Sequence, residues 1–241
     1  MSKLWLIARR ELGATVRSPL GFVVISSVLA IDGLLFNLWA LGSTPKYSAQ
    51  VLYDFFYVLS GTTMVASLFI SMRLFAEEQQ SGTISLLLTS PVKDTQVVLG
   101  KFIGAFLFLA LMTLVTLYMP MLIMVHGKIS WGHVFSGYLG LLLLGAASLS
   151  IGTFASSMAK SQIVAVFIAA AILVAMLLLW MLGKEADPPL GEVVSYMALH
   201  NLHFRPFMEG KIHLRDVVFY GSVCTFFLVA ATRMLESRRW R

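Results

Sequence analysis

Charged residues and cysteines are scarce in this sequence of 241 residues. Asp, Glu, Lys and Arg make up 12% of the chain, about half of their share in soluble domains. The single cysteine, Cys224, lies within an apolar run, which excludes a disulfide framework and a cysteine metal cluster. The phosphate-binding pattern G-x-x-x-x-G-K-[ST] does not occur, nor do H-E-x-x-H and G-x-S-x-G. We therefore expect a chain that is not an enzyme, holds no metal or cofactor of its own and does not bind ATP in the usual way.

Long apolar runs dominate what is present. Hydrophobic residues make up 58% of the chain, and runs of roughly 20 residues, each long enough to cross a bilayer, recur along it. The sequence therefore predicts an all-α membrane protein formed by a single domain over residues 1–241, without a separate soluble domain. The predicted spans are Leu20–Leu41, Val51–Leu74, Val97–Val125, His133–Phe154, Ile163–Leu182 and Leu214–Met234.

Residues 1–19 have the pattern of an amphipathic helix that lies along a membrane surface. On a helical wheel, four apolar residues share one side and three basic residues lie opposite: Trp5, Ala8, Leu12 and Val16 against Lys3, Arg10 and Arg17. Such a helix directs its basic side toward anionic headgroups. A cleaved signal peptide is the alternative, but the following apolar run is longer than a signal core and no A-x-A site follows it.

The distribution of Lys and Arg predicts the orientation of the spans. Six spans put both termini on one side, which then holds 12 of the 18 Lys and Arg residues. Since positive residues concentrate on the cytoplasmic side, we expect both termini in the cytoplasm and the protein in the cytoplasmic (inner) membrane. The net charge of +6 is then explained by topology and lipid, and no nucleic-acid partner is predicted.

The segment from Arg73 to Pro91 is the most densely polar stretch between two spans, and this topology places it in the cytoplasm. Arg73 and Glu77 are four residues apart, so they share a helix face and can pair. We expect this helix to break near Ser81 and Gly82, and a second short helix with a leucine cluster to end at Pro91. Two helices of this kind suit docking to a soluble partner; an ordinary solvated loop is the alternative.

The connection over residues 183–213 is the longest on the opposite side. Pro188 and Pro189 open it, Glu192–Leu199 has the composition of a short helix, and His200–Gly210 mixes aromatic and turn residues. We expect a pair of short interfacial or re-entrant helices that caps the outer mouth of the protein, with its aromatic side chains resting at the membrane interface.

Few charged residues lie within the predicted spans. Asp32, with Asn37 five residues later, is the deepest carboxylate and a candidate proton or ion site. Hydrogen bonding between helices is the alternative explanation for Asp32. The pair His200-x-x-His203 alone is too small a set for a metal site, so packing and hydrogen bonding are the preferred explanation.

The polar segment, with the pattern Arg73-x-x-x-Glu77-Glu78-x-x-x-Gly82-Thr83-x-x-x-Leu87-Leu88-x-Ser90-Pro91, resembles the signature of ABC-2 type exporter permeases between their second and third spans. The resemblance extends over the whole chain, through the amphipathic helix, six spans and an outer helical hairpin. More narrowly, HFRPFMEGKIHLRDVVFY resembles the permease of gliding-motility ABC transporters. The implied ATPase-coupling region is residues 73–96, with Arg73, Glu77, Glu78, Gly82, Thr83, Leu87, Leu88 and Pro91; the implied external gate holds His203, Phe204, Phe207 and Gly210.

This resemblance implies a permease subunit of an ATP-driven exporter. ATP and Mg²⁺ would bind to a separate ABC ATPase subunit, and a second permease copy or homologue would complete the transporter, with room for a further membrane or periplasmic subunit. Two other functions remain open: an ion-coupled secondary carrier that uses Asp32, and an ATPase-coupled scaffold that transmits movement without transport. The small number of charges in the spans favours a lipidic or amphipathic cargo.

Overall fold

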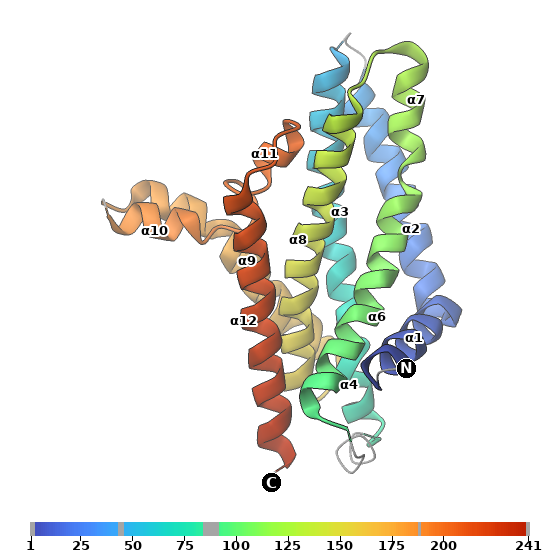
Figure 1. The fold of residues 1–241 in the computed structure, drawn as a ribbon, viewed down its shortest axis with the longest axis vertical. Coiled ribbons are helices and arrows are strands. Elements are labelled where there is room, and N and C mark those ends of the chain that lie inside the picture. The colour runs from blue at the N-terminus through green and yellow to red at the C-terminus, as the bar shows by residue number, and fades with distance from the viewer. Residues whose placement is uncertain (1–2, 43–45, 84–91, 188, 240–241) are drawn as a thin grey trace.

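The computed structural model describes residues 3–42, 46–83, 92–187 and 189–239. Within these ranges every regular element is a helix, and six helical segments are long and apolar enough to cross a membrane. The prediction of an all-α protein with six spans is confirmed. The chain is a multi-pass membrane protein (Figure 1).

The elements follow the chain in a simple order. They are α1 (Lys3–Arg17), α2 (Pro19–Leu35) with a π-helical continuation η1 (Phe36–Leu41), α3 (Ser48–Ser71), α4 (Arg73–Gln80), α6 (Asp94–Val115), α7 (Tyr118–His126), α8 (Trp131–Met158), α9 (Gln162–Glu185), α10 (Leu190–Tyr196), α11 (Arg205–Met208) and α12 (Leu214–Arg239). Each predicted span corresponds to one long helix or to two consecutive helices, with ends that differ by a few residues.

Helix α8 lies at the centre of the bundle, between α3, α6 and α12 (Figure 1). It can occupy this position because glycines let its neighbours approach closely. A Cβ atom on Gly137 would lie 2.2 Å from the ring of Phe56 in α3, and one on Gly145 would lie 2.7 Å from Leu109 in α6. The two main clusters of buried apolar side chains both include residues of α8.

Two of the predicted spans are interrupted. The predicted span Val51–Leu74 is divided at Met72, where α3 ends and α4 begins. The predicted span Val97–Val125 is divided into α6 and α7. Hydropathy does not reveal the second interruption, because Leu114, Val115 and Leu117 around it are apolar.

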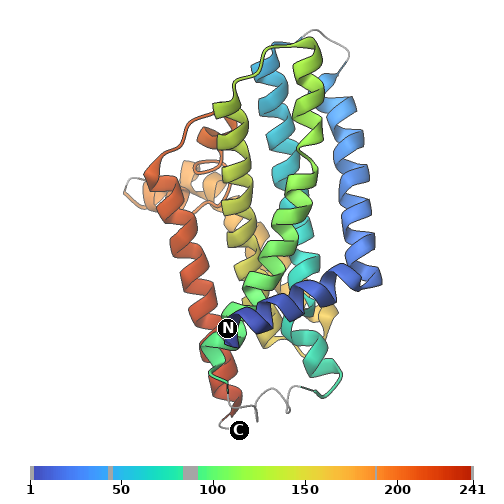
Figure 2. The ribbon, with the colours of Figure 1, turned by 45° about the vertical axis from the view of Figure 1, so that its right-hand side comes forward.

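Helix α1 crosses the end of the bundle at a steep angle to the spans (Figure 2). Two glycines of α6 allow the contact: a Cβ on Gly100 would lie 2.8 Å from Ile7, and one on Gly104 would lie 2.7 Å from the backbone oxygen of Ala8. Trp5 and Val16 remain exposed on α1. The predicted apolar side of α1 therefore has two kinds of contact. Ala8 packs against α6, whereas Trp5 and Val16 are exposed and can contact the membrane surface.

Between α9 and α12 the chain forms the two short helices α10 and α11, and α10 projects sideways from the bundle (Figure 1). The prediction that the aromatic side chains here rest at the membrane interface is wrong. Phe204 and Phe207 are fully buried in the core. They are buried because Gly140 of α8 leaves room for them: a Cβ on Gly140 would lie 2.6 Å from Phe207.

Candidate functional site

Helix α4 and the turn that follows it form the centre of the predicted coupling region. The predicted pair is confirmed: Nε of Arg73 donates to Oε2 of Glu77 at 2.7 Å. The predicted break near Ser81 is also found, since α4 ends at Gln80 and Gly82 has a φ of +72°. Nothing lies within 4 Å of a Cβ placed on Gly82. A glycine therefore suits this position because of its left-handed backbone, and not because space is short.

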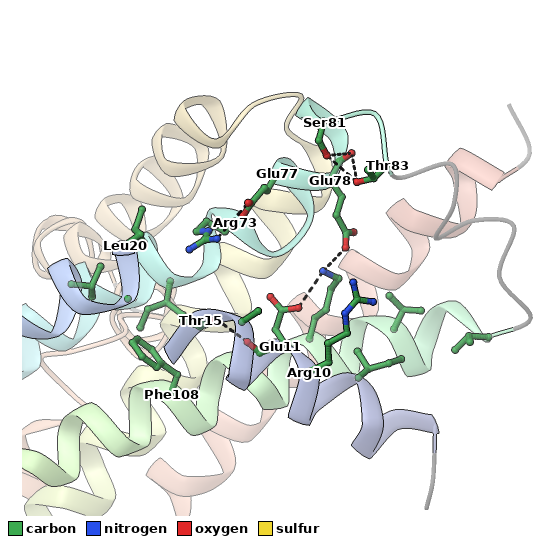
Figure 3. Close-up of a pocket in the computed structure, with 18 residues that line it drawn as sticks. Arg10, Glu11, Thr15, Leu20, Arg73, Glu77, Glu78, Ser81, Thr83 and Phe108 are labelled. Atoms are coloured by element: carbon green, nitrogen blue, oxygen red, sulfur yellow. Dashed lines mark hydrogen bonds and ion pairs between the residues drawn. The ribbon is translucent and has the colours of Figure 1, made fainter. Parts of the chain in front are cut away.

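Lys101 of α6 joins three helices at this site. Its ammonium group is 2.9 Å from Oε1 of Glu78 in α4 and 3.5 Å from Oε2 of Glu11 in α1 (Figure 3). Lys101 is only 5% exposed, and its Nζ lies 5.4 Å from the centre of the Phe75 ring. Glu78 thus points into the protein, where its second oxygen, Oε2, is buried without a hydrogen-bond partner among the described residues.

A serine of α8 caps the N-terminal end of α4. Helices leave their first backbone N–H groups without partners inside the helix, and the residue before α4 is Met72, which has no capping oxygen in its side chain. The backbone N–H groups of Phe75 and Ala76 donate instead to Oγ of Ser156, each at 3.0 Å, and that hydroxyl donates to the backbone oxygen of Met72. Ser156 therefore both fixes the break between α3 and α4 and attaches α4 to the central helix.

Two further contacts hold the other sides of α4. Nη1 of Arg73 donates to Oγ of Ser18, the residue that caps α2, at 3.0 Å. At the C-terminal end of α4, Nη1 of Arg238 in α12 donates to the side-chain oxygen of Gln79 at 2.6 Å. Helix α4 is thus bonded directly to α2, α6, α8 and α12, and through Lys101 to α1.

A cleft of about 650 Å³ opens between α1, α2, α4 and α6 beside these contacts (Figure 3). Its walls carry charges of both signs, among them Arg10 and Glu11 from α1 and Arg73 and Glu77 from α4. Glu77 is about half exposed, and the residues from Gln80 to Thr83 are exposed. We call Gln80–Thr83 the α4 tip. The α4 tip and Glu77 are accessible to another protein, whereas Glu78 is engaged inside this chain.

Three residues of the predicted coupling set lie outside the described residues. They are Leu87, Leu88 and Pro91. The predicted second helix with the leucine cluster lies in the same segment. Their role in docking stays a prediction.

The structure brings the predicted gate residues together in the connection between α9 and α12. His203 is buried, with its Nδ1 at 2.8 Å from Oδ1 of Asp216 and its Nε2 at 2.8 Å from the backbone oxygen of Tyr196. A carbonyl oxygen only accepts, so Nε2 carries a proton and donates it. Gly210 has a φ of +80° and lies against His133, whose ring bonds to the backbone oxygen of Met208. These contacts hold the connection firmly to α8 and α12; a gating role stays a prediction.

Asp32 and Asn37 are separated by the fold. Asp32 is buried in α2, and its Oδ1 has no hydrogen-bond partner among the described residues. Asn37 is exposed in the π-helical segment. The two residues therefore do not form a joint intramembrane site, and Asp32 remains the one to test.

The residues that attach α4 to the rest of the bundle were not predicted from the sequence. Lys101 lies inside the predicted span Val97–Val125, and a cation inside a span is itself a signal of a buried partner. The spacing Gly100-x-x-x-Gly104 is a known pattern of close helix contact and could have predicted the docking of α1. Ser156 carries no such signal, because serines are common in membrane helices.

Comparison with known proteins identifies the family of this chain. The family described as ABC-2 family transporter protein matches residues 5–186, from α1 to the connection after α9. The chain is 31% identical over 118 residues to the probable ABC transporter permease protein NosY of Pseudomonas aeruginosa and to the protein of the same name from Stutzerimonas stutzeri. Each alignment covers 48% of this chain and 43% of the relative, so it spans less than half of either relative's length. Because the family match extends over most of the sequence, the chain belongs to the ABC-2 family of transporter proteins.

Proposed function

We propose that this chain is the permease subunit of an exporter in the cytoplasmic membrane, driven by an ABC ATPase on a separate chain. The α4 tip and Glu77 contact the ATPase, which binds the ATP and Mg²⁺. Two features of α4 together support this proposal. The α4 tip, Gln80–Thr83, is exposed. The rest of α4 is held by hydrogen bonds and an ion pair to α2, α6, α8 and α12.

This geometry explains how movement of the ATPase reaches the spans. A push on the α4 tip moves α8 through Ser156 and moves α6 through Lys101. Since α8 is the central helix, its displacement changes the packing of α3 and α12 together. Packed helices shift between discrete arrangements more readily than they deform continuously. Closure of the ATPase dimer would thus switch the permease between inward-open and outward-open states.

The topology and assembly complete the proposal. Both ends of the described chain and α4 lie at the same end of the bundle (Figure 2), and we assign that end to the cytoplasm because of its excess of Lys and Arg. A second permease, identical or homologous, pairs with this one. The likeness of HFRPFMEGKIHLRDVVFY to gliding-motility permeases suggests that subgroup, whereas the curated relatives are permeases of another name, so the subgroup stays a prediction.

The test is co-purification of the ATPase with variants of the α4 tip. Thr83→Arg adds a bulky cation at an exposed position whose bonds are to Ser81 and the backbone of Glu78. Ser237→Arg is the matched control, since Ser237 is exposed on α12 at the same end of the bundle. We expect Thr83→Arg to lose the ATPase and ATP-dependent transport, and Ser237→Arg to keep both. If the two variants retain the ATPase equally, α4 is not the docking element.

A second pair of variants separates this function from the alternatives. Asp32→Asn should leave transport intact in an ATP-driven permease and abolish it in a proton-coupled carrier. Glu77→Lys should weaken ATPase binding. It places a cation beside Arg73, but that pair is partly exposed to water, whereas Glu78→Lys would place a second ammonium group beside the buried Lys101 and disturb the fold. Loss of activity in Asp32→Asn together with normal activity in Glu77→Lys would favour the carrier. Retained ATPase coupling without any transported substrate would favour the scaffold.

A further inference from the structure

Three helices, α4, α8 and α12, end close to one another beside the α4 tip (Figure 1). Nη1 of Arg238 in α12 donates to Oε1 of Gln79 in α4 at 2.6 Å, and its Nη2 donates to the backbone oxygen of Met158 in α8 at 3.0 Å. Nε2 of Gln79 donates in turn to the backbone oxygen of Ser157 at 3.2 Å. We call this set of residues the C-terminal junction: Gln79, Ser157, Met158 and Arg238.

The end of α8 explains why these groups bond. The last carbonyl groups of a helix have no partner inside the helix, and Ser157 and Met158 are the last two residues of α8. A cation is favourable at this end, because the helix dipole places partial negative charge there, but the last turn of α8 contains no basic residue. Arg238 supplies the cation from α12, and Gln79 supplies a second donor from α4. The end of α8 is therefore capped by two other helices.

Arginine and glutamine suit their positions in the C-terminal junction. A guanidinium group presents its N–H donors in one rigid plane, so Arg238 bonds to α4 and α8 at the same time. An amide side chain both accepts and donates, so Gln79 accepts from α12 while it donates to α8. Removal of either side chain therefore breaks the direct bond between α4 and α12.

Small residues hold α4 close to the connection between α8 and α9. Ala76 of α4, three residues before Gln79, forms a buried cluster with Ala165 of α9 and with Ala159, which follows Met158. Small residues allow such close approach of helices. Alanine has no side-chain rotamers to rearrange, and close-packed interiors transmit strain. A displacement of α4 therefore moves the end of α8 with it.

We infer that Arg238 is a positioning residue for the coupling of this permease. Together with Gln79 it connects the α4 tip to the ends of α8 and α12, so that a displacement of the tip shifts both helices as one unit. Gln79 directly precedes the α4 tip, whereas the bonds to Ser156 lie at the opposite end of α4. Without Arg238, α12 would follow only through its packing against α8. The inference rests on the proposed docking of an ATPase to the α4 tip.

The bond between Gln79 and Arg238 is tested first in the chain alone. Arg238→Met keeps the apolar stem and removes the donors, and Gln79→Leu removes the amide. Both variants break the same bond, so the fall in Tm of the double variant should be smaller than the sum of the two single falls. The measurement is thermal unfolding of the purified chain in detergent. Additive falls would show that the two side chains do not act on each other and would overturn the inference.

Movement of α12 is followed at Cys224, the single cysteine of the sequence. Cys224 is half-buried in α12 and packs against the apolar core, so a bimane label on its sulfur reports how α12 packs. The full chain is labelled, placed in nanodiscs and then combined with the ATPase. We expect ATP with vanadate, which arrests the ATPase during its cycle, to change the bimane emission of the wild type. A wild type without this change would show that α12 does not respond to the ATPase, and the inference would be overturned.

Arg238→Met should retain the ATPase and lose the emission change at Cys224. Arg233→Met is the matched control, because Arg233 is an exposed cation of the same helix whose ion pair is with Glu236 of α12 itself. It should keep both the ATPase and the emission change. Arg238→Lys keeps the charge without the planar fork and should not restore the response, whereas a role of charge alone would be restored by it. An Arg238→Met chain that responds like the wild type, or that loses the ATPase altogether, would overturn the inference.

Two variants of Gln79 separate the bond to α12 from the bond to α8. In Gln79→Glu the carboxylate still accepts from Arg238 but has no N–H for the carbonyl of Ser157. We expect Gln79→Glu to keep the response at Cys224 and Gln79→Leu to lose it; equal responses would contradict a connection through Arg238. The failure of the proposed function is read from ATPase binding in Thr83→Arg and Ser237→Arg. The failure of this inference is read from the emission of complexes that retain the ATPase, so the two are distinguishable.

Discussion

Lys101 provides the sharpest test of how the helices at the candidate site are held together. It lies between Glu78 and Glu11, at 2.9 and 3.5 Å, and is itself 5% exposed. Lys101→Met keeps most of the apolar stem and removes only the ammonium group. Two partly buried carboxylates then face each other without a cation. Removing one partner of a fully buried pair costs about 3–5 kcal/mol.

The carboxylates here are not fully buried, since the side chains of Glu11 and Glu78 are 22% and 27% exposed. Water reaches them and lowers the cost, so we expect Lys101→Met to reduce the free energy of unfolding by about 2 kcal/mol. For a chain of this size that corresponds to a fall in Tm of about 4–8 °C. Adding Glu78→Gln to Lys101→Met should restore about 1 kcal/mol, because the repulsion between the two carboxylates disappears.

The assay is thermal unfolding of the purified chain in detergent, followed by tryptophan fluorescence, for both single variants and the double variant. Lys160→Met is the control, because Lys160 is an exposed cation at the same end of the bundle. We expect its Tm to change by less than about 2 °C. A loss of stability in Lys101→Met no larger than in Lys160→Met, or an interaction energy near zero between positions 101 and 78, would refute the interpretation that Lys101 joins α1, α4 and α6.

Three further predictions concern topology, packing and pH. Tags at either terminus should resist protease added to intact cells, and a tag between α9 and α10 should be cut; the opposite pattern would reverse the orientation. Phe207→Ala should lower the free energy of unfolding by about 3–5 kcal/mol, measured by thermal unfolding, because Phe207 is fully buried; a stability unchanged from that of the wild type would contradict its place in the core. Burial lowers the pKa of His200 below 6.5, so the unfolded chain takes up this proton first and stability falls as pH drops below about 6.5. The fall in Tm between pH 7.5 and pH 5 should be smaller in His200→Gln, and an equal fall would exclude His200 as a contributor.

The sequence predicted the features that follow from hydropathy and local spacing. The six spans were found because a bilayer requires about 20 apolar residues per helix, and the pair Arg73–Glu77 was found because residues four apart share a helix face. The end of α4 near Ser81 and Gly82 was found from turn chemistry. Each of these depends only on residues close together in the chain.

Contacts between distant segments were not predictable in the same way. Lys101 meets Glu11 across 90 residues of sequence, and nothing near either residue indicates the other. The burial of Phe204 and Phe207 depends on Gly140 in another helix; in the sequence alone, aromatic residues beside turn residues look like an interfacial segment. Likewise, the break at Met72 depends on a hydroxyl group from α8.

The docking of α1 onto α6 has a consequence for the order of events during synthesis. Helix α1 leaves the ribosome well before its binding surface exists, because Gly100 and Gly104 follow it by most of a hundred residues and Glu11 lies 90 residues ahead of Lys101. At 5–20 residues per second, α1 waits roughly 5–20 s for its partner. During this interval its exposed apolar flank, with Trp5 and Val16, has only the bilayer surface to rest on. We therefore expect α1 to lie on the membrane surface during this interval. It docks onto the bundle once α6 is inserted and Gly100 and Gly104 are in place.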